Sequence, residues 1–230
     1  MVSVVIPTYN EANHIAQTIH KIRASGRRDV EIIVVDGGST DATISVVRNA
    51  GVHALISNRK GRAVQMNKGA AVATGEVLYF LHADTVPPAG FVPQILDAHQ
   101  KGAVGGCFRL SFDYDHWFLK AHAWFSRFNV NAIRFGDQSL FVSKKVFHEC
   151  GGFREDLLVM EDHEIVQRLS KCGKFEVMND TIVTSARKFL DNGIFRTMGA
   201  FYRIWILYYL GYPQERLVKS YRQWIKNPKL

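Results

Sequence analysis

Cysteine is scarce in this chain of 230 residues, which contains only Cys107, Cys150 and Cys172. No two of them form a C-x-x-C pair, and none lies at a spacing typical of metal ligands. The sequence therefore shows no sign of a disulfide framework or a cysteine-held metal centre. We expect three reduced thiols that act as small core residues in a cytoplasmic setting.

Long hydrophobic runs are also missing, because no segment reaches the roughly 18 apolar residues that a membrane-spanning helix needs. The nearest segment, 201–210, is short and contains Arg203. Residues 1–7 read as a strand and lack the basic region and cleavage site of a signal peptide. We therefore expect a cytoplasmic protein whose contact with a membrane is at most peripheral, at its inner face.

Acidic residues are outnumbered by basic ones, 21 against 29, which gives a formal net charge of +8. Such a balance favours an anionic partner, for example a nucleotide, a phosphorylated substrate or an acidic membrane surface. Hydrophobic residues make up 47% of the chain, an ordinary value for a globular protein with a core. The length suits one large domain, with or without a helical appendage.

Short apolar runs alternate with segments of helical spacing along the first half of the chain. Strands are expected at 2–6, 31–35, 53–57 and 77–81. This alternation predicts an α/β fold with a parallel, doubly wound sheet and right-handed crossovers. Further along we expect a helix at 91–100, a strand at 103–112, a strand ending at 142, a helix at 160–169, two short strands ending at 184, and a helix at 194–210.

The run 77–81 reads as a strand buried on both faces, and it stops at His82 and Asp84. Ligands of open α/β sheets bind at the carboxyl ends of the strands. A carboxylate there, beside a neutral imidazole, suits a divalent metal that holds a diphosphate. A simple cap of the turn before Pro87 explains Asp84 equally well at this point.

Two further loops lie at the same edge of the predicted sheet. Asp36 ends the second strand, where its carboxylate could accept hydrogen bonds from a base or a ribose, and Gly38 allows a ligand close to the backbone. Gly61 and Arg62 belong to a basic turn at a helix start, which makes a good anion site. A solvated basic turn is the alternative for this second loop.

A second acidic element opens the helix at 160–169. Asp162 shares a helix face with the apolar Ile165 and Leu169, so its carboxylate is expected to point inward. Glu161 and Glu164 are expected to complement the helix dipole from outside. A buried, aimed carboxylate is what a general base requires, and Asp162 is therefore our candidate.

Aromatic residues gather in two places. The run 117–128 is interleaved with basic residues and could line an acceptor groove, although a half-buried amphipathic helix is the simpler interpretation. We expect the helix at 194–209 to pack its aromatic-rich side against the sheet. Its remaining basic face would then meet anionic lipid or a second copy of the chain.

Four elements in this order resemble the family 2 glycosyltransferases, which have the GT-A fold. They are VVIPTYNE at 4–11, VVDGGSTD at 34–41, HAD at 82–84 and the pair Glu161-Asp162. The resemblance covers most of the first 190 residues. Smaller details at 61–67, 136–138 and 184–187 resemble a bacterial subgroup, the radical-SAM/selenodomain-associated transferases.

The resemblance implies a GT-A catalytic domain at 1–190, with a nucleotide-binding half at 1–86 and an acceptor half at 87–190. A helical extension at 191–230 would pack on the same domain. The implied activity is transfer of one sugar, with inversion, from a UDP- or GDP-linked donor to an unknown hydroxyl acceptor, assisted by Mg or Mn. Nucleic acid is not an implied partner.

The resemblance also assigns site residues by position. Asp84 would ligate the metal, Arg187 and Lys188 would bind the diphosphate, and Asp162 would be the base, with Glu161 as its rival. The implied nucleotide site consists of Pro7, Tyr9, Glu11, Asp36, Gly38, Gly61, Arg62, Asn67, His82 and Ala83. The implied acceptor or sugar site consists of Gly136, Asp137 and Gln138.

Three departures from the family pattern are visible. His82 replaces the usual first Asp of the DxD element, and no histidine follows His163, where the family often has a further metal ligand. Arg187 and Lys188 could neutralise the diphosphate instead and lower the dependence on metal. The QxxRW motif of processive synthases is missing, which favours transfer of single sugars.

Two other classes of function are considered. A sugar-nucleotide-forming nucleotidyltransferase usually carries a loop rich in glycine and basic residues after the first strand, where this chain has residues 8–11, Thr-Tyr-Asn-Glu. A non-catalytic, membrane-peripheral binding protein would explain the aromatic and basic carboxyl end. The presence of both Asp84 and Asp162 weighs against that second class.

Overall fold

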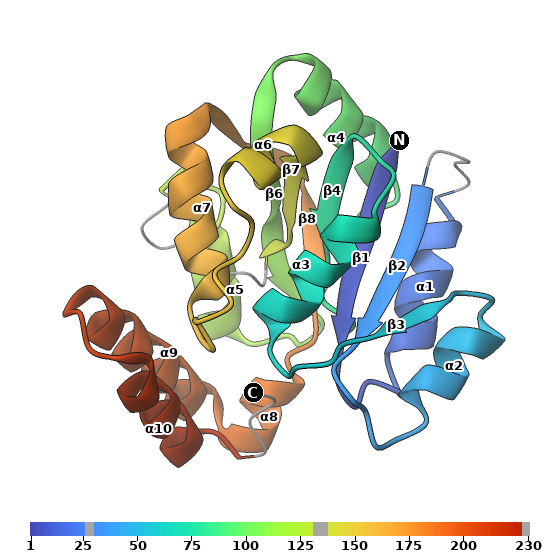
Figure 1. The fold of residues 1–230 in the computed structure, drawn as a ribbon. Helices are drawn as coiled ribbons and strands as arrows, with labels where there is room; N and C mark the ends of the chain where they lie inside the picture. Colours follow the sequence, from blue (N-terminus) through green and yellow to red (C-terminus); the bar gives the residue numbers. More distant parts are fainter. Residues whose placement is uncertain (26–29, 131–137, 227–230) are drawn as a thin grey trace.

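The computed structural model describes residues 1–25, 30–130 and 138–226, which form a mixed sheet covered by helices (Figure 1). The described strands pair in the order β3-β2-β1-β4-β7-β6-β8-β5. Their bounds are β1 (Val2–Thr8), β2 (Val30–Asp36), β3 (Ala54–Ile56), β4 (Val77–Phe80), β5 (Thr85–Val86), β6 (Ala103–Phe112), β7 (Leu140–Ser143) and β8 (Lys174–Thr184).

Helices connect these strands and extend beyond them at the carboxyl end. Their bounds are α1 (Ile15–Arg23), α2 (Thr43–Asn49), α3 (Arg62–Val72), α4 (Phe91–Gln100), α5 (Trp117–Phe125), α6 (Lys144–Glu149), α7 (Glu161–Cys172), α8 (Arg187–Asn192), α9 (Ile194–Tyr209) and α10 (Gln214–Trp224). No helix in the described ranges is long and apolar enough to cross a bilayer.

The four strands predicted in the first half pair in parallel, with β1 between β2 and β4. Strand β4 is buried on both faces, as its unbroken apolar sequence predicts. Tyr79 belongs to the core under α1 and α4, and Leu78 and Phe80 belong to the core under α3, α6 and α7 (Figure 1). Parallel strands thus bring their carboxyl ends to one edge.

The second half of the sheet is mixed: β6 and β8 pair in parallel, and antiparallel strands lie beside them. Strand β7 is antiparallel to β4 and β6, and β5 is antiparallel to β8. The two short strands expected before residue 184 are one strand, β8. Its register against β6 shifts at Phe108 and Arg109, opposite Asn179 and Asp180. These two polar residues form an irregularity within the strand, whereas the break in the apolar pattern predicts the end of a strand.

Two of the three cysteines do not lie in the core. Cys107 is buried, but Cys150 is partly exposed and Cys172 is exposed, and the Sγ atoms of this pair are 2.9 Å apart. Cys150 follows α6 and Cys172 ends α7, so the packing of these helices brings together residues far apart in the sequence. The expectation of isolated core thiols is right for Cys107 alone.

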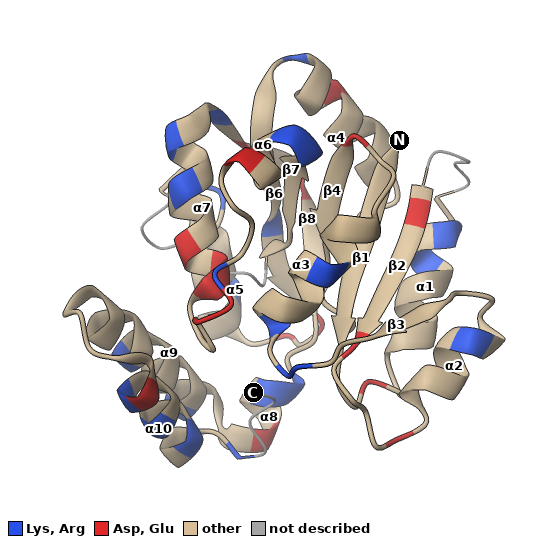
Figure 2. Cartoon of the chain, viewed as in Figure 1, with Lys and Arg blue, Asp and Glu red and all other residues tan. Residues whose placement is uncertain are grey.

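Helices α9 and α10 form a hairpin that packs on the segment before α7. Its core includes Ile204, Leu207 and Leu217, together with Val159 and Met160. Basic residues lie along α10 (Figure 2), but the expectation that α9 turns its aromatic-rich side toward the sheet is wrong. Phe195, Tyr202 and Tyr209 of α9 remain exposed, and its buried residues Ala200, Ile204 and Leu207 pack with α10 instead of the sheet.

Gly69 allows α3 to lie close to β1 and β2. A Cβ atom there would overlap Val5 and come within 3.1 Å of Val35 Cγ2. We expect Gly69→Ala to lower the free energy of unfolding by about 1–3 kcal/mol, because overpacking outweighs the better helix propensity of alanine. Urea denaturation measures the change.

Gly199→Ala is the matched control, because its Cβ would meet the edge of the Trp224 ring at 3.3 Å and no atom closer. We expect this variant to be neutral or more stable than the wild type. Equal stabilities of the two variants would contradict the close approach of α3 to the sheet.

Candidate functional site

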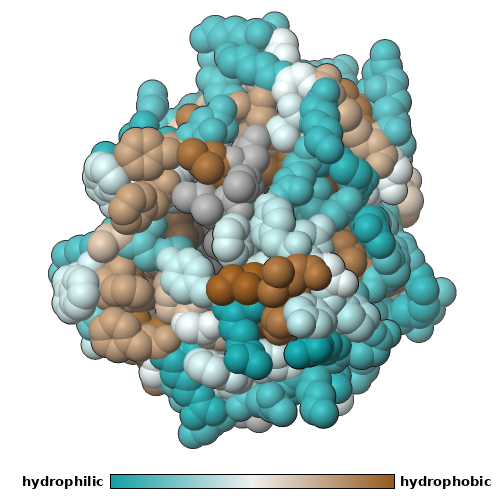
Figure 3. Space-filling view, turned by 90° about the vertical axis from the view of Figure 1, so that its left-hand side faces the viewer, coloured by the Kyte–Doolittle hydropathy of each residue, from teal (hydrophilic) through white to brown (hydrophobic). Residues whose placement is uncertain are grey.

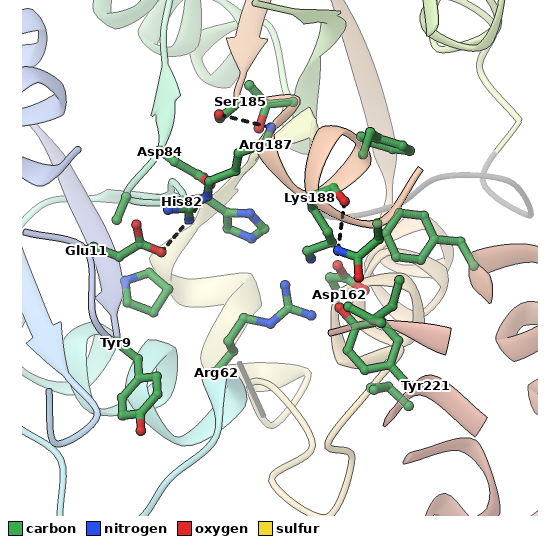
Figure 4. A pocket seen from close by; sticks show the side chains of 18 of the residues that line it. Tyr9, Glu11, Arg62, His82, Asp84, Asp162, Ser185, Arg187, Lys188 and Tyr221 are labelled. Carbon is green, nitrogen blue, oxygen red and sulfur yellow. Dashed lines mark hydrogen bonds and ion pairs between the residues drawn. The ribbon is translucent and has the colours of Figure 1, made fainter. Parts of the chain in front are cut away.

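A cavity of about 440 Å³ opens at the carboxyl ends of the parallel strands (Figure 4). Its walls come from the loops after β1 and β4, the amino ends of α3 and α7, and the helices α8, α9 and α10. The sequence-predicted residues that line it are Pro7, Tyr9, Glu11, Gly61, Arg62, His82, Ala83, Asp84, Asp162, Arg187 and Lys188.

Arg187 bridges two acids that come from different strands. Its Nη2 atom donates to Glu11 Oε1 at 2.6 Å and to Asp84 Oδ2 at 2.7 Å. Strand pairing brings Arg187 close to Asp84. Thr85 lies opposite Thr184, and the amide of Ser185 donates to the carbonyl of Asp84. The guanidinium at the start of α8 can therefore reach back over the end of β4.

Neighbouring positive groups determine the charge state of Asp84. Burial would raise the pKa of Asp84, but Arg187, His82 and Lys188 together outweigh burial, and the pKa lies below its ordinary value. Asp84 is therefore ionised at neutral pH, and the local group has two carboxylates for one guanidinium. Such a site offers a hard oxygen ligand on one side and a cation on the other.

A second ion pair joins the amino ends of α3 and α7. Arg62 Nε lies 2.8 Å from Glu161 Oε1, and the side chain of Glu161 is only 1% exposed against 35% for Arg62. Burial raises the pKa of Glu161 to about 7, although Arg62 acts in the opposite direction. Glu161 is therefore not an outward-facing complement of the helix dipole, because it lies in the wall behind Arg62.

Asp162, one residue further on, faces the cavity. It is half-buried, it lines the pocket, and its Oδ1 atom accepts a hydrogen bond from the amide of His163 at 2.7 Å. Figure 4 shows Asp162 across the pocket from Glu11, with the side chain of Arg62 reaching into the space between them. The two neighbouring acids of α7 thus have different environments.

Asp36 and Gly38 belong to the loop after β2 and are not among the residues that line the pocket. Asp36 is fully buried, and its Oδ2 atom accepts hydrogen bonds from the amides of Gly38 and Ser39, both at 2.8 Å. Gly38 has a φ of +88°, which favours glycine. A role of Asp36 or Gly38 in nucleotide binding stays a prediction.

Asn67 and Gln138 also lie outside the pocket lining. The Asn67 side chain accepts from the amide of Phe153 and donates to its carbonyl, while Gln138 Nε2 donates to the carbonyls of Phe108 and Ser126. Both amides thus satisfy backbone groups, as buried polar groups require. The expected Gly136 and Asp137 lie outside the described residues.

Several pocket residues were not predicted from the sequence. Lys60 lies 5.4 Å from the ring centre of Tyr9, a contact that the basic turn at 59–62 could have indicated. Others come from elements whose position only the tertiary structure reveals; they include His122, Asp191, Met198, Phe201, Tyr202 and Tyr221. Sequence patterns predicted helices there but not the wall that they form.

Asp84 is the residue that would hold the implied Mg or Mn ion. In the described ranges, no three His, Cys, Asp or Glu side chains form a group that could hold a metal. Mg²⁺ in nucleotide sites is commonly held by one or two carboxylates together with substrate phosphates. Asp84 fits such an ion, which would arrive with the diphosphate and share the carboxylate with Arg187.

The chain is similar to proteins that are named as sugar transferases. An uncharacterized glycosyltransferase of Nostoc sp. is 33% identical over 111 residues, which is 46% of this chain and 34% of that protein. An undecaprenyl-phosphate 4-deoxy-4-formamido-L-arabinose transferase of Aeromonas hydrophila is 29% identical over 131 residues, covering 52% of this chain and 40% of that protein. The chain thus spans well under half the length of these relatives.

Solved structures confirm the predicted GT-A fold. A mannosyltransferase of Pyrobaculum calidifontis in complex with GDP-Man and Mn²⁺ has a TM-score of 0.72 at 20% identity, covering 88% of this chain and 61% of that one. TarS of S. aureus in complex with UDP-GlcNAc has a TM-score of 0.67 at 16% identity, covering 80% of this chain and 58% of that one.

The family model of glycosyl transferase family 2 matches residues 3–155, more than half of the 230 residues. The match includes three of the four elements that carry the resemblance, and Glu161-Asp162 lies just beyond it. The bacterial subgroup stays a prediction. The chain belongs to glycosyl transferase family 2.

Proposed function

We propose that this protein transfers a single sugar from a UDP- or GDP-linked donor to an acceptor hydroxyl and inverts the anomeric carbon. The observation that carries the proposal is the pair of opposed groups in one pocket, with Arg187 held by Glu11 and Asp84 on one side and Asp162 on the other. Structural neighbours that bind GDP-Man and UDP-GlcNAc support a nucleotide-sugar donor.

The donor diphosphate would bind where positive side chains converge. Arg62, Arg187, Lys60 and Lys188 all line the pocket, on the side where the parallel strands end. Charge-assisted hydrogen bonds from guanidinium groups to phosphate are strong and directional. The nucleoside would then lie over the loop after β1, within the half of the domain formed by residues 1–86.

The carboxylates explain how a metal ion would assist. Glu11 and Asp84 leave a net negative charge after Arg187 is counted, and a diphosphate adds more negative charge to the same space. Mg or Mn held by Asp84, when bound, would supply charge neutralisation for the leaving diphosphate. Arg187 and Lys188 supply part of the same neutralisation, so dependence on the metal would be partial.

Asp162 would serve as the general base. It would take the proton of the acceptor hydroxyl while the acceptor oxygen forms a bond to the anomeric carbon and the bond to the diphosphate breaks. The nucleoside diphosphate leaves on the opposite face, and one in-line displacement inverts the configuration.

A direct test distinguishes this activity from nucleotidyl transfer. Nucleoside diphosphates and nucleotide sugars would first be screened by thermal shift, with and without Mn, because a ligand stabilises the fold that binds it. Turnover of a positive nucleotide sugar should release free UDP or GDP. Release of pyrophosphate, or failure of every UDP and GDP compound to shift the melting temperature, would contradict the proposal.

Asp162→Asn keeps the size of the side chain and removes its basicity. We expect turnover to fall by about 10²–10⁴-fold, the usual contribution of a general base, with donor binding nearly unchanged. Steady-state kinetics and calorimetry measure the two quantities. Asp97→Asn is the control, because Asp97 lies on the surface of α4 with a 58% exposed side chain. Near-normal turnover, or a product of retained configuration by NMR, would overturn the mechanism.

Arg187→Ala removes the cation expected to contact the diphosphate. We expect the dissociation constant of the nucleoside diphosphate to rise by about 10–100-fold in chelator, since a charged hydrogen bond is worth about 1.5–3 kcal/mol. Added Mn should restore binding to the variant by a larger factor than to the wild type. Calorimetry measures both affinities, and Arg48→Ala on the surface of α2 is the control. Equal affinities of Arg187→Ala and the wild type would show that Arg187 does not contact the diphosphate.

Glu161→Gln tests the buried acid. Burial raises the pKa of Glu161 from 4.5 to about 7, so the folded protein holds this proton where the unfolded chain has released it. The stability from this group is full below pH 4.5 and is lost as the pH rises to about 7. Over that window the free energy of unfolding should fall less in the variant, by on the order of 2–4 kcal/mol.

Urea denaturation at a series of pH values measures this difference. Glu149→Gln provides the matched control, since Glu149 is exposed on α6 and should follow the wild type. Parallel stability curves for the wild type and Glu161→Gln would show that Glu161 ionises normally in the folded protein.

A further inference from the structure

Helix α9 has two apolar faces, and only one of them is buried. Ile204 and Leu207 belong to the core with α10, whereas Phe195, Tyr202 and Ile206 are 61%, 47% and 50% exposed. Residues 195, 202, 206 and 209 follow helical spacing, so they form one stripe along the helix. A helix that is apolar on opposite faces is normally covered on both.

Helix α5 extends this stripe sideways. Trp117 is 68% exposed, and its ring lies 6.4 Å from that of Phe195, which also contacts Phe118 at 5.0 Å. We call the surface formed by Trp117, Phe195, Tyr202, Ile206 and Tyr209 the aromatic face. Figure 3 shows hydrophobic side chains gathered on the side of the molecule that carries these helices.

The clustering is not the ordinary scatter of single exposed apolar residues. Of the eighteen large apolar side chains that are exposed in the described part of the chain, thirteen lie within 114–130 or 190–212. Large contiguous apolar patches mark surfaces that meet a protein, a ligand or a membrane. The aromatic face is therefore a candidate docking surface, and its chemistry indicates which kind of partner fits it.

The positive charge near the aromatic face distinguishes between a second copy of the chain and a lipid surface as its partner. The hairpin from 194 to 226 carries six basic side chains and one acidic one, and the whole chain has a net charge of +8. Arg127, next to α5, lies over the ring of Trp124 at 4.7 Å. A second copy would bring the same positive charge to the interface, whereas anionic lipid headgroups would complement it. Tryptophan and tyrosine are also enriched at membrane interfaces.

We propose that the aromatic face docks on a bilayer that contains anionic phospholipid, and that the acceptor is an amphiphile carried in that bilayer. The second part rests on the proposed function. Tyr202 belongs both to the aromatic face and to the wall of the pocket, and His122 of α5 also lines the pocket. Docking through this face brings the pocket to the headgroup region, where a membrane-borne hydroxyl can enter.

Vesicle sedimentation tests the docking. The full chain should bind vesicles of phosphatidylcholine and phosphatidylglycerol more tightly than vesicles of phosphatidylcholine alone, and salt should weaken the binding. Brominated lipids should quench its tryptophan fluorescence, because Trp117 and Trp124 are exposed on or beside the face. No binding to phosphatidylglycerol vesicles at low salt by protein that still binds nucleotide would overturn the proposal.

A double variant, Trp117→Ala with Phe195→Ala, should bind these vesicles at least about tenfold more weakly, because two anchoring rings are lost. Neither residue lines the pocket, so nucleoside diphosphate affinity should be unchanged. The control, Ile56→Ala with Val72→Ala, removes exposed apolar side chains elsewhere and should bind vesicles as the wild type does. Equal losses in both variants would contradict docking through this face.

Two further experiments test the two parts of the proposal separately, the docking and the acceptor. A wild-type dimer in analytical ultracentrifugation that the double variant converts to a monomer would assign the face to a second copy and overturn docking. With a labelled donor selected by thermal shift, lipid-containing vesicles should yield label in an organic-extractable product, and less of it with the double variant. Label found only in water-soluble product would overturn the assignment of the acceptor while leaving sugar transfer intact.

Discussion

The bridge from Arg187 to Glu11 and Asp84 ties together the parts of the fold that make the pocket. Each residue follows or precedes a different element: Glu11 lies after β1, Asp84 after β4 and Arg187 at the start of α8. The antiparallel pairing of β5 with β8 is what allows the meeting, since it places the end of β8 beside the end of β4. A mixed sheet is therefore needed to bring the three residues of this bridge together.

A second ion pair connects two other elements on the opposite side of the pocket. Arg62 at the start of α3 contacts Glu161 at the start of α7, and this contact sets the position of the adjacent Asp162. Breaking a buried pair leaves an uncompensated charge, which is costly in a low-dielectric interior. Glu161 and Asp162 thus show how two neighbouring acids on one helix acquire different roles, one in the wall and one facing the ligand space.

Much of the first half of the fold could be predicted from sequence, because β4 and its parallel neighbours are apolar runs whose ends carry polar residues. The same logic found Asp84, Arg62 and Asp162, all of which line the pocket. It failed where side-chain partners come from distant segments. The sequence predicts a helix-end acid at Glu161, because the contact with Arg62 depends on the tertiary fold, and it predicts a strand end at the irregularity at 179–180. The position of α9, with its exposed aromatic stripe, depends on tertiary packing that helical periodicity does not encode.

We propose that this pocket holds a nucleoside diphosphate through Arg187. The most direct measurement is a crystal structure of the protein with UDP or GDP, whichever gives the larger thermal shift. We expect diphosphate oxygens within hydrogen-bond distance of Arg187, at the carboxyl ends of β1 and β4. A nucleotide bound elsewhere, or one whose phosphates do not contact Arg187, would contradict it.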